Sequence, residues 1–169
     1  MIIGDNGNTD VRRVSIFTSG ASTFNGSIWF TNTAADPNRS RAIWDTTSIL
    51  NFVIGANGVN NNIAGVGTAI FNGAFNFDLT GADTTLGDSW NIVNVSSSTY
   101  GGTFSVTGFT QNGTLWDDPI GNTGNEFEYN PATGILSVNP VPEPSTLSLM
   151  GGLGLLGFVL RRRSKAVVK

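Results

Sequence analysis

The chain has 169 residues and a formal net charge of -3, and 12% of its residues are charged. It contains neither Cys nor His. Without Cys there is no disulfide, thiolate nucleophile or zinc-thiolate site, and without His the commonest general base and metal ligand near neutral pH is missing. The 11 Phe and 4 Trp are large apolar groups that favour burial, so we expect the body of the chain to fold.

The charge is divided unevenly along the chain. Five of the nine basic residues lie at the C-terminal end, at Arg161, Arg162, Arg163, Lys165 and Lys169. The preceding 160 residues carry four Arg against all twelve carboxylates. Such an acidic body repels phosphate backbones, which excludes nucleic acid as a partner. Because both Lys are in the tail, Schiff-base chemistry in the body is excluded as well.

Residues 1–139 show the pattern of a β-rich domain. Apolar residues recur with a period near two between clusters of Gly, Asn, Asp and Pro, which predicts strands at 27–31, 49–54, 68–79, 90–95, 103–109, 126–129 and 135–138. A loop is expected at 34–49, and Pro131 and Gly134 predict a hairpin between the last two strands. The fold class is therefore all-β, as an antiparallel β-sandwich or, alternatively, the end of a β-solenoid.

A short motif occurs twice in the body. Phe24-Asn25-Gly26 and Phe71-Asn72-Gly73 are each followed by alternating apolar residues. The two copies could be corresponding strands of a duplicated sandwich, successive rungs of a Gly- and Asn-rich solenoid, or a chance similarity in a biased composition.

Carboxylates are the first candidates for chemistry, because glycoside hydrolysis needs only two of them. Asp117 and Asp118 are adjacent, so on a strand their side chains point to opposite faces. Glu126 and Glu128 share a face, about 7 Å apart at a rise of about 3.3 Å per residue. An exposed strand face flanking Phe127 is the favoured explanation of the two Glu. We therefore predict a non-enzyme and assign no catalytic residue.

Calcium is the one metal that the acidic turns suggest. Asp5 to Asp10 lacks the order of an EF-hand loop and its downstream Glu. Asp83 and Asp88 bracket a second acidic turn and are weak calcium candidates, although Asp in turns commonly bonds the backbone instead. No cofactor is required by the sequence.

The tryptophans are candidates for a sugar-stacking surface. Trp90 alternates with apolar residues, as a core residue does, whereas Trp44 and Trp116 lie in less regular stretches. Trp44 and Trp116 are therefore the candidate ligand-binding residues, and burial in the core is the alternative for both.

The last thirty residues have a separate organisation. An apolar run from Leu147 to Leu160 follows Val141-Pro142-Glu143-Pro144 and ends at Arg161-Arg162-Arg163. As a helix it would be roughly 21 Å long against a bilayer core of about 30 Å, and the Arg side chains can reach the headgroups. We predict a short transmembrane helix at about 146–160, with residues 164–169 as a cytoplasmic tail and the body outside.

This order of Pro-Glu-Pro motif, Gly-rich apolar helix and Arg stop at residues 140–163 resembles the PEP-CTERM sorting signal of Gram-negative bacteria. The resemblance implies recognition by an exosortase, with Val141, Pro142, Glu143 and Pro144 as the sorting motif and Arg161, Arg162 and Arg163 as the membrane stop. It implies export to the cell surface or extracellular matrix, a transient anchor in the inner membrane, and an association with exopolysaccharide or biofilm.

The body resembles, in composition, the closing module of autotransporter-type β-strand-repeat proteins, over 77–82, 87–93, 102–106 and 133–138. A secretory signal is expected with such a tail, yet the first residues show no basic segment followed by an apolar run. We therefore expect the chain to be a fragment of a longer exported protein. The predicted function is a structural surface or matrix protein; the alternatives are a carbohydrate-binding module and a glycoside-active enzyme.

Overall fold

The computed structural model describes residues 2–4, 14–18, 23–31 and 40–142. Within these ranges all regular structure is β, in strands numbered β1 to β15, so the all-β prediction is confirmed. No helix in the described ranges is long and apolar enough to cross a bilayer. The helix predicted at about 146–160 lies outside the described residues.

Two of the three sheets consist of parallel strands, and we call them the coil sheets. The first has the order β1-β4-β7-β5-β2, with β10 also pairing to β7. Its strands are β1 (Ile2–Gly4), β2 (Val14–Thr18), β4 (Ile28–Thr31), β5 (Ser40–Trp44), β7 (Ile63–Phe71) and β10 (Val93–Tyr100). The second has the order β11-β8-β6-β3, with β3 (Thr23–Asn25), β6 (Ile49–Val53), β8 (Ala74–Asp78) and β11 (Ser105–Val106).

The parallel register shows that the chain winds in coils of roughly 25 residues, within the range of solenoid repeats. Phe24 pairs with Leu50, which in turn pairs with Phe75. One position further on, Asn76 Nδ2 donates a hydrogen bond of 2.8 Å to Asn51 Oδ1 of the coil before. The repeated Phe-Asn-Gly motif is therefore not stacked copy on copy, because Phe24 stands in the rung of Phe75 and not in that of Phe71.

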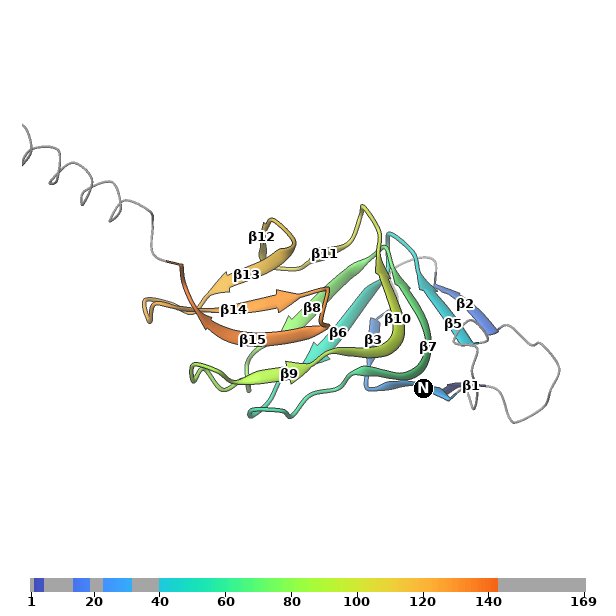
Figure 1. Ribbon diagram of the computed structural model, residues 1–169, viewed down its shortest axis with the longest axis horizontal. Coiled ribbons are helices and arrows are strands. Elements are labelled where there is room, and N and C mark those ends of the chain that lie inside the picture. The colour runs from blue at the N-terminus through green and yellow to red at the C-terminus, as the bar shows by residue number, and fades with distance from the viewer. Residues whose placement is uncertain (1, 5–13, 19–22, 32–39, 143–169) are drawn as a thin grey trace, which may run out of the picture.

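The third sheet is antiparallel, and we call it the cap sheet. It has the order β12-β13-β14-β15-β9 and lies on the left of Figure 1, beside the coils. Its strands are β9 (Ser89–Asn91), β12 (Thr110–Asn112), β13 (Leu115–Pro119), β14 (Asn125–Asn130) and β15 (Ile135–Pro140). The predicted hairpin joins β14 to β15, with Gly134 N–H donating to the Asn130 carbonyl at 2.8 Å.

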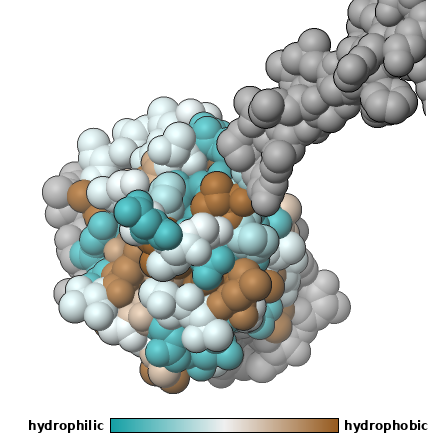
Figure 2. All heavy atoms as spheres, turned by 90° about the vertical axis from the view of Figure 1, so that its left-hand side faces the viewer, coloured by the Kyte–Doolittle hydropathy of each residue, from teal (hydrophilic) through white to brown (hydrophobic). Residues whose placement is uncertain are grey.

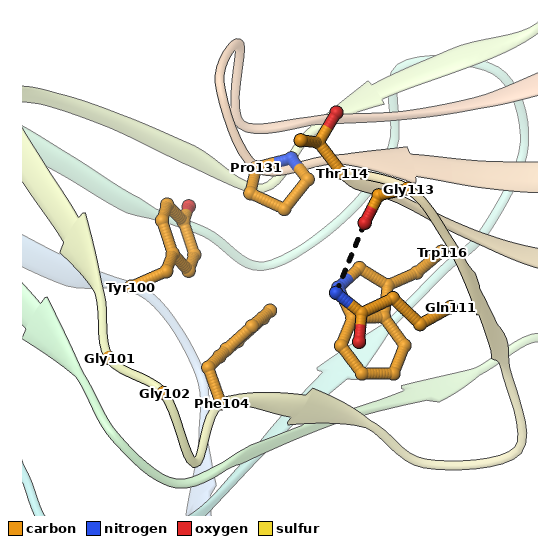
Figure 3. A pocket seen from close by; sticks show the side chains of 9 residues that line it. All are labelled: Tyr100, Gly101, Gly102, Phe104, Gln111, Gly113, Thr114, Trp116 and Pro131. Atoms are coloured by element: carbon orange, nitrogen blue, oxygen red, sulfur yellow. Dashed lines mark hydrogen bonds between the residues drawn. The ribbon is translucent and has the colours of Figure 1, made fainter.

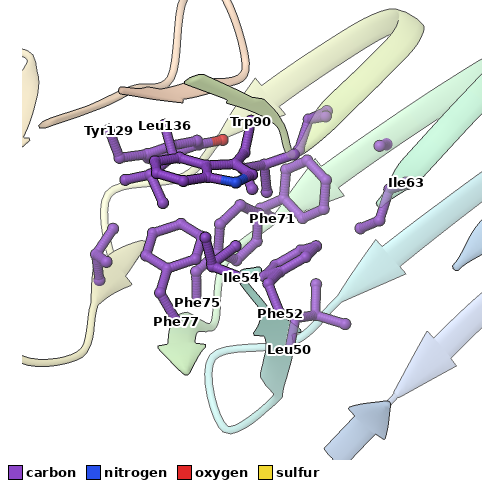
Figure 4. Packing of buried hydrophobic residues seen from close by; sticks show 14 of the residues in the cluster. Leu50, Phe52, Ile54, Ile63, Phe71, Phe75, Phe77, Trp90, Tyr129 and Leu136 are labelled. Atoms are coloured by element: carbon purple, nitrogen blue, oxygen red, sulfur yellow. The ribbon is translucent and has the colours of Figure 1, made fainter. Parts of the chain in front are cut away.

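All three sheets contribute to one aromatic core (Figure 4). Phe75 of β8 lies at its centre, with ring centroids 4.9 Å from Phe71 of the first coil sheet and 5.6 Å from Tyr129 of the cap sheet. Trp90 of β9 is buried and donates its indole N–H to the carbonyls of Gly55 and Ala56. The coils and the cap therefore share a single packed interior.

The sandwich prediction fits this packing of sheets around a common core, but its antiparallel strand direction is wrong for the two coil sheets. There the strands run parallel because the chain completes a coil before it returns to its neighbour, as the solenoid alternative requires. Antiparallel pairing is restricted to the cap sheet, where short turns reverse the chain.

Two local predictions need correction. Residues 40–44 form β5 where a loop was expected, because small residues alternate inward with Trp44 while Arg41 points out. The predicted strand at 68–79 is divided between β7 and β8, which belong to different sheets. Gly73 lies at this corner, where a Cβ would come 2.2 Å from the Ser48 carbonyl oxygen.

Candidate functional site

The predicted sorting motif begins where the chain leaves the cap sheet. Val141 follows β15 directly and donates its N–H to the Gly124 carbonyl at 2.9 Å, while both Val141 and Pro142 are exposed. Glu143, Pro144 and the predicted membrane stop Arg161, Arg162 and Arg163 lie outside the described residues. The described body thus ends in β15, the second strand of a hairpin, and the first residues of the motif follow this strand directly.

Trp44, one of the two candidate sugar-stacking residues, belongs to the core. Its side chain is 2% exposed, and its ring stacks on Phe71 at 4.9 Å between centroids. A ring covered in this way has no free face for a sugar. The interpretation of Trp44 as a ligand-binding residue is therefore corrected in favour of the core alternative.

Trp116, the other candidate, is also a member of the hydrophobic core at 9% exposed, but unlike Trp44 it lines a hollow of about 290 Å³ between the end of β10 and the cap sheet (Figure 3). The ring of Phe104 is perpendicular to that of Trp116, with 5.8 Å between the ring centroids, and its centroid lies 4.7 Å from that of Tyr100. The other lining residues come from the turns around these rings: Gly101, Gly102, Gln111, Gly113, Thr114 and Pro131. We call this hollow the aromatic pocket.

Polar groups accompany the rings of the aromatic pocket, although Tyr129, the partner of Tyr100, is fully buried behind the lining residues. Gln111 is exposed and donates its side-chain amide to the Gly113 carbonyl at 3.2 Å (Figure 3). On the opposite side, the hydroxyl groups of Tyr100 and Tyr129 are hydrogen bonded at 2.8 Å. Burial raises the pKa of Tyr100 to about 12, so this phenol stays neutral and can donate a hydrogen bond.

The weak calcium candidates Asp83 and Asp88 use their carboxylates on backbone N–H groups. Asp83 Oδ2 accepts from the Asn57 N–H and Asp88 Oδ2 from the Thr85 N–H, each at 3.0 Å. These bonds fix the loops that connect β6 to β7 and β8 to β9. The two side chains therefore have a loop-stabilising role of the kind that Asp has in ordinary turns.

The structure brings together three other carboxylates, which we call the acidic cluster. Asp117 of β13 is paired directly with Glu128 of β14, and Glu126 lies two positions away on the same face of the cap sheet. One carboxylate oxygen of each residue lies within 4.8 Å of those of the other two. Glu126 is buried at 6% exposed, Asp117 lies at the border between buried and half-buried at 9% exposed, and Glu128 is half-buried.

The electrostatics of the acidic cluster disfavour its full ionisation. Burial raises the pKa of Glu126, and the neighbouring charges of Asp117 and Glu128 raise it further. Burial and the Asp117 charge likewise raise the pKa of Glu128, against the effect of a hydrogen bond that Glu128 Oε1 accepts from Asn139 at 2.9 Å. The side chains are thus held near one another at an electrostatic cost.

The same carboxylates were expected from the sequence to form different pairs. Asp117 was grouped with Asp118, whose side chain lies on the other face, and Glu126 with Glu128 alone. The cluster needs the pairing of Asp117 with Glu128 across two antiparallel strands. A hairpin prediction for β13 and β14 would have been the signal, but residues 115–119 were not predicted as a strand.

The face on the left of Figure 1 shows hydrophilic side chains beside several separate hydrophobic clusters (Figure 2). Among the exposed large apolar side chains of the described residues, Leu86, Ile135 and Val141 lie in or next to the cap sheet. No single apolar or charged patch of described residues dominates this face.

Comparison with known families identifies the C-terminal segment. A family model described as the PEP-CTERM protein-sorting motif matches residues 140–163, the segment predicted from the residues themselves. The match supports an exported protein that an exosortase processes and that associates transiently with the membrane through its C-terminal region. No curated protein and no solved structure matches the chain significantly.

Proposed function

We propose that the chain is a non-enzymatic structural protein of the bacterial surface or of a biofilm and exopolysaccharide matrix. The observation that carries this proposal is the sorting motif at residues 140–163, which starts at the last residue of β15. The motif accounts for export and processing. The body that is exported is a coiled domain built around one hydrophobic core. Supporting this, most of the described aromatic side chains of the coil sheets are buried, with the exception of Trp29, which is exposed.

The delivery step is tested by replacing Pro142, Glu143 and Pro144 with Ala in an exosortase-bearing host. The altered chain is expected to accumulate as an unprocessed, membrane-associated form, whereas the wild-type chain is processed and released. Val53→Ala is the control, since Val53 is 54% exposed on β6 and lies outside the motif. Unchanged processing of the motif variant would contradict the proposal.

A second candidate is a carbohydrate-binding module, which the aromatic pocket favours. Tyr100, Phe104 and Trp116 surround an open hollow with an amide and hydroxyl groups at its edge, the combination that suits the CH and OH groups of a sugar. This function would place exopolysaccharide in direct contact with the body and would fit an exported protein.

Binding of the full chain to a panel of bacterial polysaccharides tests this second candidate. Trp116→Ala should weaken a positive interaction by about 10-fold or more, because a pocket aromatic is lost. Trp29→Ala is the matched control, since Trp29 is 50% exposed and lies outside the aromatic pocket. Equal losses in the two variants would argue against the pocket. Hydrolysis of a polysaccharide that disappears in Glu126→Gln would instead overturn the non-enzymatic proposal.

A further inference from the structure

We propose that the acidic cluster of Asp117, Glu126 and Glu128 is a binding site for a divalent cation, and specifically for Ca²⁺. The three residues offer carboxylate oxygens within 4.8 Å of one another on a rigid antiparallel pair of strands. This inference concerns the cap sheet and is independent of the sorting motif and of the aromatic pocket.

The strongest observation is the unsatisfied carboxylate of Asp117. This residue is only 9% exposed, and its Oδ1 is buried without a hydrogen-bond partner. The other buried side-chain oxygen without a partner among the described residues is the neutral hydroxyl of Ser40. A buried carboxylate oxygen without a partner is costly, and it lies in the one acidic cluster found in the described part of the chain.

No protein cation neutralises the cluster within the described residues. Arg41 is the single basic residue of that part of the chain, and it lies on β5 of the first coil sheet rather than in the cap. Three carboxylates within 4.8 Å of one another repel when no counterion lies between them. Burial is the main cause of the raised pKa values of Glu126 and Glu128, and this repulsion adds to it. A bound divalent cation removes this repulsion and supplies the partner that Asp117 lacks.

The chemistry of the ligands selects a hard cation. All three donors are carboxylate oxygens, whereas copper and zinc favour nitrogen and sulfur ligands. Ca²⁺ takes oxygen ligands at about 2.3–2.6 Å in flexible geometry, whereas Mg²⁺ demands near-ideal octahedral geometry at about 2.0–2.1 Å and gives up its water reluctantly. Carboxylate oxygens that lie within 4.8 Å of one another on two fixed strands suit the wider and more flexible coordination of Ca²⁺, and the half-buried Glu128 leaves room for water to complete it.

A second layer of hydrogen bonds orients the ligands. Asn139 of β15 is paired with Glu126 and donates to Glu128 Oε1 at 2.9 Å and to Ser137 Oγ at 3.2 Å. Asn139 is therefore a positioning residue that holds Glu128 toward the cluster. Such outer residues typically affect metal affinity by about 10–100-fold.

The experiment uses the full 169-residue chain in mild detergent, stripped of metal and then titrated with CaCl₂ or MgCl₂. Calorimetry measures the affinity, and circular dichroism measures the unfolding temperature. At a Ca²⁺ concentration about 100 times its Kd, the unfolding temperature should rise by about 5–10 °C. Mg²⁺ at the same concentration should raise it less.

Asp117→Asn separates a metal ligand from a residue that merely supports the fold. With the repulsion reduced, this variant should unfold at a higher temperature than wild type in metal-free buffer, and its response to Ca²⁺ should be lost. Glu126→Gln should behave in the same way. Asp83→Asn is the matched control and should keep the wild-type response, because the Asp83 carboxylate bonds the Asn57 backbone in a separate loop.

Three results would overturn the proposal: a wild-type chain that does not respond to Ca²⁺, a normal response in both cluster variants, or loss of the response in Asp83→Asn. A response to Mg²⁺ that exceeds the response to Ca²⁺ would overturn the assignment of the ion. Because each variant is compared with itself in metal-free buffer, a general loss of stability cannot imitate the expected pattern.

Discussion

The coil sheets and the cap sheet share one core but differ in where they place charge. Among the described strands of the coils, the charged residues are Arg41 and Asp78, and Asp78 stands at the end of β8. In the cap, four carboxylates lie on β13 and β14, and two of them are buried. The coils are therefore organised for stacking, whereas the cap holds like-charged groups close together in a partly buried place, at an electrostatic cost.

The difference also shows in the hydrogen bonds that link neighbouring strands through side chains. In the coils, the amide of Asn76 bonds the amide of Asn51, so a neutral pair is stacked from one coil to the next. In the cap, Asp117 of β13 is paired with Glu128 of β14, and both side chains are carboxylates. Stacking of neutral groups repeats without an electrostatic cost, and a pair of carboxylates does not.

The largest expected effect comes from a ring that joins the two regions. Phe75→Ala should destabilise the protein by about 3–5 kcal/mol, because a fully buried aromatic in contact with Phe71 and Tyr129 is lost. Urea unfolding should remain a single transition, since both regions lose the same contact. Val53→Ala, on the 54% exposed outer side of β6, should change stability by less than about 0.5 kcal/mol. Two separate transitions would show that coil and cap fold independently.

A smaller effect is expected where the cap hairpin touches the coil. Gly134 has a φ of 69°, and a Cβ there would come 2.0 Å from the Val93 carbonyl oxygen. Its own carbonyl accepts the N–H groups of Ile92 and Val93. Gly134→Ala should therefore cost about 3 kcal/mol, the sum of backbone strain and a clash that displaces β10 from the hairpin.

Gly113→Ala is the matched control for that junction. Gly113 has a similar φ of 63°, but a Cβ there meets nothing within 4 Å. This variant should lose only the backbone contribution, about 1 kcal/mol. Thermal unfolding of both variants measures the difference, and equal losses would mean that contact between cap and coil contributes nothing.

The smallest expected effect is a difference in how the free energy of unfolding depends on pH when a carboxylate of the cap or one of the coils is replaced. The pKa of Glu126 is raised in the fold, so its contribution favours folding below the unfolded pKa of about 4.3 and is lost as pH rises through the folded value. In metal-free buffer, Glu126→Gln should therefore gain about 1 kcal/mol at pH 7 and almost nothing at pH 4, measured by urea unfolding.

Asp78 in the coil should show the opposite sign. Hydrogen bonds from the hydroxyl and backbone N–H of Thr80 lower its pKa, so its contribution to stability is present above the unfolded pKa and is lost as pH falls. Asp78→Asn should therefore lose stability at pH 7 and not at low pH. The same pH dependence for both variants would remove the electrostatic distinction between cap and coil.

Much of the fold could be predicted from local pattern. The strands around Trp29, Phe52, Phe127 and Leu136 alternate clearly, and the Pro131 and Gly134 hairpin has a recognisable turn. The parallel direction could not be predicted, because it depends on pairing between strands about one coil apart and not on any turn. In β5 the inward residues Ser40 and Ala42 are too small and too polar to give a strand signal.

For the candidate site, the register in which the strands pair could not be predicted, although the residue types could be. The sorting segment could be predicted because its parts are contiguous in the sequence. The acidic cluster could not, because Asp117 and Glu128 meet only through the pairing of β13 with β14. Similarly, the burial of Trp44 follows from its stacking on Phe71, which is fixed by a parallel pair between β5 and β7.

The bond between Val141 and Gly124 fixes the point at which the sorting segment leaves the body. Residues 141–145 lie between β15 and the membrane segment that the sequence predicts from about 146, and five residues span at most about 18 Å even when fully extended. If that segment enters the bilayer, the cap sheet is tethered within this distance of it, and the length of the tether limits the room in which an exosortase can act.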